Sequence, residues 1–365
     1  SNGYGPDSPY NSDLPYDIEQ LALFGELSYD ITDRLNVTLG GRYYDFEEER
    51  RFTTGGLFSN GDDQVDSTSS DGFNPRLQVS YDVSDEMTIN AQASQGFRLG
   101  GVNDPLNVPL CDAGDLETFG AFQAYDDETL WNYELGFKSE FDKVRFNAAV
   151  FYTDIEDLQV TLDAGSCSSR ISFNVPEAHT LGVEWELVAY PMELLMLTFS
   201  GSLLEAEFDS TVTDSNGNVL GGVEDGNRLA SVPEFQMAAS ATYTFPVNAF
   251  GSNEMYVSAM FQHVGDRYTQ PSDQVAGAGN FVSGLPFGGA TGAEVTAVDL
   301  ELDAYEQVNL RAGIVWDTFE TVFYVDNVTD ENAQLSFDRE RGGRARLAYR
   351  NNQPRTIGVT VRKFF

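Results

Sequence analysis

The closing segment of the chain, PRTIGVTVRKFF (354–365), decides the fold. Every second residue points to the same face, and this face is apolar, with Ile357, Val359 and Val361 in succession. Only Lys363 interrupts it. The positions between them carry Thr, Gly and Arg. A repeat of two residues is typical of a β-strand with one apolar face and one polar face. The segment therefore predicts a strand at the end of the chain.

The same alternation recurs along most of the sequence. It is clear in LNVTLGGRYYDF (35–46), MTINAQAS (87–94) and VRFNAAVFY (144–152). Each repeat is long enough for a strand of roughly 10 residues, the length that crosses a membrane in a β-barrel. About thirteen strands are expected, near 18–30, 34–48, 72–83, 86–98, 129–141, 143–157, 178–190, 194–207, 233–246, 253–265, 304–316, 319–328 and 354–365.

The linkers between these strands alternate in length. Tight turns are expected near 30–34, 82–86, 141–144, 190–194, 246–253 and 316–319. Long polar stretches separate them, at about 49–71, 98–128, 208–232, 267–303 and 329–353. A soluble sandwich would show connections of similar size at both ends, whereas short turns on one side and long loops on the other are typical of a transmembrane β-barrel. The sequence thus predicts an all-β, antiparallel transmembrane barrel.

In such a barrel the apolar faces contact lipid and the polar faces line a wet lumen. Aromatic side chains gather near the predicted strand ends, where an amphipathic ring is most stable at the membrane interface. These residues are Tyr43, Tyr81, Trp131, Tyr190, Phe245 and Trp316.

Composition narrows the classes of function. The chain has 21 basic and 58 acidic residues and a formal net charge of −37, which excludes a nucleic-acid binder because phosphates need Lys and Arg. No stretch approaches the roughly 20 apolar residues of a membrane-spanning helix, and the first residues lack the pattern of a signal peptide.

The odd strand count indicates that the barrel is partial. A single-chain bacterial barrel has an even number of strands, because its first and last strands pair antiparallel. If the parent barrel has 22 strands, thirteen strands ending at Phe365 correspond to its C-terminal part. We therefore expect residues 1–365 to be one partial barrel domain.

Several segments in order resemble the barrel of a TonB-dependent outer-membrane receptor. They are ASQGFRLGGVNDP (93–105), NYELGFKSEF (132–141), HTLGVEWEL (179–187), VNLRAGIVWDTFETVFYVDNVTDENA (308–333) and PRTIGVTVRKFF (354–365). The resemblance spans nearly the whole chain. The plug domain and the TonB box of that family are not found in this sequence. Lys363 departs from the aromatic or apolar residue common at its position, whereas Phe365 is similar to the terminal signal read by the barrel-assembly machinery.

The resemblance implies energy-coupled import of a scarce nutrient, most often a ferric siderophore. The expected partners are the inner-membrane TonB complex, acting through the missing N-terminal part, the barrel-assembly machinery, outer-membrane lipid and lipopolysaccharide, and a small-molecule nutrient. No cofactor is expected. A passive porin and a soluble β-rich adhesin remain as alternatives, distinguished by strand count and by the need for detergent.

Two loop regions are candidates for ligand binding. The last long loop carries Arg341, Arg344 and Arg346 in an otherwise acidic chain, and Arg forks suit the carboxylates or catecholates of an anionic siderophore. Alternatively, these arginines pair with acidic loops or with lipopolysaccharide phosphates. In GFRLGGVNDP, Arg98 and Asn103 are expected near the barrel mouth, where the glycines also have a structural explanation.

Cys111 and Cys167 both fall in loops on the oxidising side of the membrane, which predicts one disulfide between neighbouring loops. We assign no metal site, because the acidic segment DSNGN (214–218) is better explained as a turn than as a calcium loop. The only histidines, His179 and His263, have no catalytic spacing, so we expect no enzyme.

Overall fold

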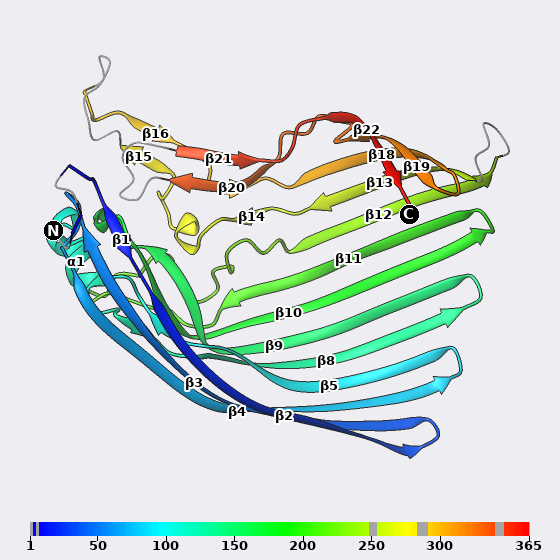
Figure 1. Ribbon diagram of the computed structural model, residues 1–365, viewed down its shortest axis with the longest axis horizontal. Helices are drawn as coiled ribbons and strands as arrows, with labels where there is room; N and C mark the ends of the chain where they lie inside the picture. Colours follow the sequence, from blue (N-terminus) through cyan, green and yellow to red (C-terminus); the bar gives the residue numbers. More distant parts are fainter. Residues whose placement is uncertain (1–2, 5–6, 248–253, 283–290, 340–346, 365) are drawn as a thin grey trace.

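In the computed structural model the chain forms one long antiparallel sheet that curves into an open trough (Figure 1). The structure describes residues 3–4, 7–247, 254–282, 291–339 and 347–364. All thirteen predicted strands are present, and the all-β antiparallel fold is confirmed. These long strands are β2 (Tyr16–Thr32), β3 (Leu35–Gly55), β4 (Asp63–Ser84), β5 (Met87–Arg98), β8 (Glu128–Phe141), β9 (Val144–Asp163), β10 (Arg170–Met192), β11 (Leu195–Phe208), β12 (Phe235–Pro246), β13 (Glu254–Val264), β18 (Tyr305–Val315), β19 (Phe319–Asp326) and β22 (Thr356–Lys363).

Each long strand pairs with its neighbour in the chain, as in an up-and-down barrel wall. The short strand β1 (Asn11–Asp13) is the fourteenth member of the sheet and pairs with the outer end of β3, beyond the last residue paired with β2. Within the described residues, β2 and β22 each pair with one strand of the sheet, so they form its two edges.

The outer face of the sheet is apolar and exposed. On β22 the side chains of Ile357, Val359 and Val361 are 75%, 55% and 66% exposed. A soluble sandwich would bury such a face in its core, whereas lipid covers it in a membrane barrel. The opposite face is polar, and hydroxyl pairs such as Thr198 and Ser240 hydrogen-bond across it, with 2.7 Å between their oxygens. The alternation read from the sequence thus separates the lipid side from the lumen side.

The two ends of the sheet differ as expected. Short turns join the strand pairs at one end, and the long connections gather at the other, where the small elements lie (Figure 1). The link between β12 and β13 falls partly outside the described residues. None of the helices in the described part of the chain is long and apolar enough to cross a membrane.

The predicted ends of four strands were wrong. The stretch 49–71, predicted as a loop, instead extends β3 to Gly55 and begins β4 at Asp63. Likewise β9 continues to Asp163, and β10 already begins at Arg170. The outer ends of β3 and β9–β10 are stabilised because loops pack on them, and Phe52 and Phe173 are buried there. The strand lengths predicted from the sequence therefore cover mainly the membrane-spanning parts of these four strands.

Loops 99–127 and 209–232 pack on the outer ends of β9, β10 and β11, and we call this assembly the disulfide body. Its short elements are β6 (Gly101–Val102), η1 (Val108–Leu110), α1 (Ala113–Phe119), β7 (Ala124–Tyr125) and η2 (Gly165–Cys167). Its core contains thirteen buried apolar residues: Leu106, Phe119, Ile155, Leu162, Ala164, Cys167, Ile171, Phe173, Val175, Ala178, Phe208, Leu220 and Val223.

A second assembly, the hairpin body, combines residues 265–282 and 291–303 with the last hairpin. Its elements are β14 (Arg267–Tyr268), η3 (Pro271–Gln274), β15 (Asn280–Val282), β16 (Val295–Ala297), β17 (Glu301–Leu302), β20 (Gln334–Arg339) and β21 (Leu347–Asn351). Among the described residues its buried core is smaller, with Leu300, Leu302 and Phe337.

Candidate functional site

The disulfide expected from the sequence is present at the barrel mouth. Cys111 follows η1, Cys167 ends η2, and the two are bonded across 56 residues of chain. Cys167 is fully buried within the disulfide body. Because the bond joins the loop after β5 to the tip of the β9–β10 hairpin, it fixes two parts of the mouth to each other.

Polar contacts beside the disulfide hold the same two loops. Asp112 caps α1 by accepting from the Asp115 backbone N–H at 2.9 Å. The Asp115 carboxylate then accepts from the backbone N–H and the hydroxyl of Ser166, at 2.7 and 2.6 Å. These bonds align α1 with η2, so the disulfide is one part of a wider junction.

Asn103 is engaged by backbone groups. Its Nδ2 donates to the carbonyl oxygens of Phe122 at 3.0 Å and Ser172 at 2.7 Å, and its Oδ1 accepts from the Ser172 N–H at 2.8 Å. The amide thus ties loop 99–127 to β10. This structural role was not seen in the sequence, and contact of Asn103 with a ligand stays a prediction.

Arg98 ends β5 and lies at the mouth, as expected. Its Nη2 lies 2.5 Å from Glu128 Oε2 and donates to the Gln159 carbonyl oxygen at 2.7 Å. Just over half of its side chain, 53%, is exposed. The guanidinium is therefore held in place by β8 and β9 and is open to solvent on one side. Contact of Arg98 with a ligand stays a prediction.

The remaining predicted site residues lie outside the described residues: Arg341, Arg344, Arg346 and Phe365. The two strands that flank the three arginines in the sequence nevertheless form a hairpin. In it β20 pairs with β21, from Gln334 opposite Asn351 to Arg339 opposite Leu347. Arg350, on β21, is exposed.

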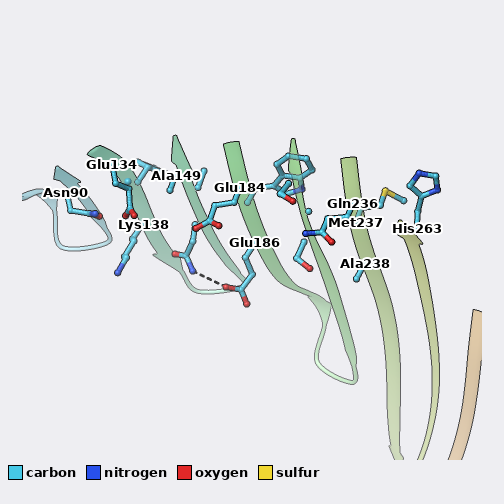
Figure 2. A pocket seen from close by; sticks show the side chains of 18 of the residues that line it. Asn90, Glu134, Lys138, Ala149, Glu184, Glu186, Gln236, Met237, Ala238 and His263 are labelled. Carbon is cyan, nitrogen blue, oxygen red and sulfur yellow. Dashed lines mark hydrogen bonds between the residues drawn. The ribbon is translucent and has the colours of Figure 1, made fainter. Parts of the chain in front are cut away.

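The lumen wall holds a pocket that sequence reasoning missed. It is open, has a volume of about 700 Å³, and extends from β5 across β8 to β13. Figure 2 shows Glu134, Lys138 and Glu186 pointing to one side of the sheet and His263 to the other. Glu184 shares the lumen face with Glu186, whose carboxylate accepts from Asn147 Nδ2 at 3.4 Å.

Three carboxylates, those of Glu134, Glu184 and Glu186, line this pocket together with one lysine. In the part of the chain that the structure describes, Glu134 and Glu184 have no ion pair, although Lys138 lies on the same wall. Elsewhere on the lumen face acids are paired: Arg76 contacts Glu26 and Arg362 contacts Glu320. The sequence signal was present in YELGFK and GVEWEL, where acids stand on the polar face, but alternation alone does not separate paired from unpaired acids.

The groups considered for chemistry in the sequence have structural partners. His179 Nδ1 lies 2.8 Å from the Asp209 carboxylate, and His263 Nδ1 lies 3.5 Å from Glu306. Asp214 Oδ1 accepts from the Asn216 and Asn218 N–H groups at 2.8 and 2.9 Å. The Asn218 side-chain amide and these backbone donors hold the pKa of Asp214 below its usual value, as in a turn.

Comparison with known proteins identifies this architecture. The family described as "TonB dependent receptor-like, beta-barrel" matches residues 1–328. The chain belongs to the TonB-dependent receptor β-barrel family. The transmembrane barrel predicted from the sequence and its location in the outer membrane are confirmed by this match. The family consists of outer-membrane receptors and transporters rather than enzymes.

The TonB-dependent receptor barrel is also similar to individual proteins. It is 27% identical over 236 residues to the pesticin receptor of Yersinia pestis, an alignment that covers 64% of this chain and 32% of the relative. Its fold matches the ferric yersiniabactin uptake receptor FyuA of Yersinia pestis with a TM-score of 0.73 and 21% identity, over 98% of this chain and 47% of FyuA.

The siderophore receptor PiuA of Acinetobacter baumannii shares the fold as well, with a TM-score of 0.66 and 17% identity, over 96% of this chain and 44% of PiuA. The barrel chain thus spans about half the length of these solved receptors and about a third of the pesticin receptor.

Proposed function

We propose that this barrel is part of an outer-membrane receptor that imports a ferric siderophore by TonB-dependent energy coupling. The observation that carries the proposal is the match of nearly the whole sheet to a ferric yersiniabactin uptake receptor, together with family membership over residues 1–328. The fold likeness to the siderophore receptor PiuA supports the same cargo class.

Membership of the TonB-dependent receptor family supports a second protein element inside the barrel, which would cover the lumen acids. A carboxylate removed from water is stable only with donors or cations around it. We infer that a plug domain, encoded outside this chain, fills the trough and presents basic or N–H groups to Glu134 and Glu184. Energy from the inner-membrane TonB complex would act on that plug, and no bond of the nutrient is made or broken.

The mouth provides the ligand surface of the proposal. Arg98 lies partly exposed beside the fixed disulfide body, and Arg341, Arg344 and Arg346 belong to the last hairpin. Arginine forks bind carboxylate, phenolate or catecholate oxygens in pairs, so an anionic ferric complex suits them. Asn103 is retained as a ligand candidate, although its amide already binds backbone groups.

Uptake of radioactive iron tests this proposal. The full-length receptor is expressed in a strain lacking its own siderophore receptors, and ferric yersiniabactin and ferric citrate are supplied as probes. We expect receptor-dependent accumulation of at least one complex, abolished by deletion of the energy-transducing genes or by a protonophore.

Two results would overturn the proposal. Accumulation that persists without the energy-transducing complex would indicate a passive porin. Surface labelling would show whether the receptor is in the outer membrane. If it is there and neither probe accumulates, the two ferric complexes are excluded as cargo and the nutrient belongs to another class.

A further inference from the structure

The apolar outer face of the sheet is hollowed towards the short turns of β11 to β22. A hollow of about 740 Å³ is lined there by residues of six strands, from Leu195 on β11 to Val359 on β22. A second hollow of about 450 Å³ adjoins it on the side of β10. Ala241 and Ala259 line both hollows, which therefore meet at this pair. We call the combined depression the outer groove.

The register of the sheet explains the outer groove. Ala241 and Ala259 are direct partners on β12 and β13. The larger side chains of Leu197 and Leu310 flank this pair in the same row of the sheet. Two methyl groups between longer side chains leave a depression in the surface. Its volume falls within the roughly 300–1,000 Å³ of small-molecule pockets.

A cation lies at the short-turn end of the same face. Lys363 stands opposite Phe319 in the β19–β22 ladder, and Phe319 stacks on Trp316 with 4.3 Å between the ring centroids. Of the three lysines in the sequence, Lys138 lines the lumen pocket and Lys143 lies in the β8–β9 turn. Lys363 is therefore the lysine of the apolar face, and it lies beside aromatic rings of the kind found at a membrane interface.

The spacing between this lysine and the outer groove matches one half of a bilayer. Ile357 and Val359 precede Lys363 by six and four residues on the same face of β22, and both line the groove. A strand rises by roughly 3.3 Å per residue and tilts by roughly 45°, which places these two positions about 9–14 Å deeper in the membrane than Lys363. Half of the hydrocarbon core is about 15 Å thick. An acyl chain whose headgroup lies at Lys363 therefore reaches the groove.

We propose that the outer groove binds an acyl chain of an anionic glycerophospholipid whose phosphate is held by Lys363. The short turns lie on the periplasmic side, where the leaflet of an outer membrane is built of glycerophospholipids. An ammonium group has three donors, so Lys363 binds a phosphate in addition to its contacts within the protein. A zwitterionic headgroup carries an ammonium of its own, which Lys363 repels, so the site favours a lipid with a net negative charge. The site does not depend on which nutrient the receptor carries.

Native mass spectrometry of the full-length receptor in detergent tests this site. The probes are dioleoyl phosphatidylglycerol and dioleoyl phosphatidylethanolamine, added in equal amounts. We expect one phosphatidylglycerol to stay bound after the loosely held lipids have been removed. Three results would overturn the proposal: retention of neither lipid, equal retention of both, or a dimer of the receptor that excludes lipid.

A pair of charge variants tests the headgroup contact. Lys363→Gln is expected to weaken retention of phosphatidylglycerol by about fivefold, the effect of one basic side chain near an anionic headgroup. Lys143→Gln removes the same charge from an exposed position at the same end of the barrel and should leave retention unchanged. Equal retention by these two variants would contradict the role of Lys363.

A second pair of variants tests the acyl-chain contact. Ala259→Leu fills the outer groove and is expected to abolish retention of phosphatidylglycerol. Ala91→Leu makes the same change at an exposed position of β5, outside the groove, and should have no effect. Unchanged gel migration of the unheated barrel shows that each variant is folded. Retention that survives Ala259→Leu, or that falls equally in Ala91→Leu, would overturn the proposal.

Discussion

The disulfide body and the hairpin body lie side by side at the barrel mouth but are stabilised in different ways. Thirteen buried apolar residues and the Cys111–Cys167 bond support the first. In the described residues only Leu300, Leu302 and Phe337 form the buried core of the second, in which Arg267 donates to the Gln334 carbonyl oxygen. Arg228 of the first body donates to Asp266 of the second. Because apolar burial supplies most of the stability of a folded unit, the first body is expected to be rigid and the second adaptable.

This difference assigns separate tasks to the two bodies. The disulfide body covers the ends of β9, β10 and β11 and supports the partly exposed Arg98. The hairpin body contains the β20–β21 hairpin and contacts the disulfide body through the hydrogen bonds of Arg228. In the proposed receptor, the disulfide body would form a fixed part of the mouth and the hairpin body an adaptable part.

Loss of the disulfide is expected to have the largest effect. The bond closes 56 residues of chain, and chain entropy alone gives it a stabilisation of about 4 kcal/mol. A Cys111→Ser, Cys167→Ser variant should lose hydrogen-exchange protection in α1 and η2. Protection in β20 and β21 should remain unchanged. Equal loss in both bodies would show that they fold as one unit.

Truncating one phenylalanine in each body gives the next test. Phe173 is 3% exposed beside Phe122, and Phe337 is 2% exposed beside Tyr349. Replacement by Ala costs about 3–5 kcal/mol at a buried site. We expect Phe337→Ala to make β20 and β21 sensitive to protease, whereas Phe173→Ala leaves the disulfide body folded. The reverse pattern of cleavage would contradict the comparison.

Removing the Asn103 amide should have an intermediate effect. Asn103→Ala leaves the Ser172 N–H and carbonyl oxygen without their partner, which costs about 1–3 kcal/mol locally. Faster hydrogen exchange at Ser172 is the expected readout. Asn216→Ala, whose side chain is exposed, serves as the control. Unchanged exchange at Ser172 would show that Asn103 does not position the loop.

Substituting the hairpin arginines should affect stability least and binding most. Arg341, Arg344 and Arg346 replaced together by Ser are expected to leave the melting temperature unchanged and to weaken binding of ferric citrate by about tenfold or more, which is about 1.4 kcal/mol. A neutral ferric trihydroxamate is the control ligand. Unchanged affinity for ferric citrate would remove these residues from the ligand surface.

The strand pattern could be predicted because lipid and water act on opposite faces of every strand. Segments such as 87–94 and 144–152 show this alternation, and each is a strand where expected. The outer part of β3 could not be found in this way. Phe46, Arg50 and Phe52 are buried there under loop 99–127, a contact between segments far apart in the sequence.

The site was predicted in part for a similar reason. Two cysteines in loops on one side of the membrane are enough to predict a disulfide. The lumen acids and the contacts of Arg228 were missed because the sequence does not show which charged side chains find a partner in the folded chain. Glu134 and Glu26 have the same polar-face signature, yet among the described contacts of these two acids only Glu26 meets an arginine.

The most direct test of the account is the environment of neighbouring side chains on β13. Spin labels at Val257→Cys and Ser258→Cys are introduced into the full-length receptor in lipid bilayers, and relaxation by oxygen and by a water-soluble nickel complex is measured. Val257 is 47% exposed on the apolar face, while Ser258 lies 3.0 Å from the Thr242 hydroxyl on the polar face. We predict that oxygen in the lipid reaches position 257 and not 258. Equal shielding of both labels from oxygen would contradict a lipid-facing barrel.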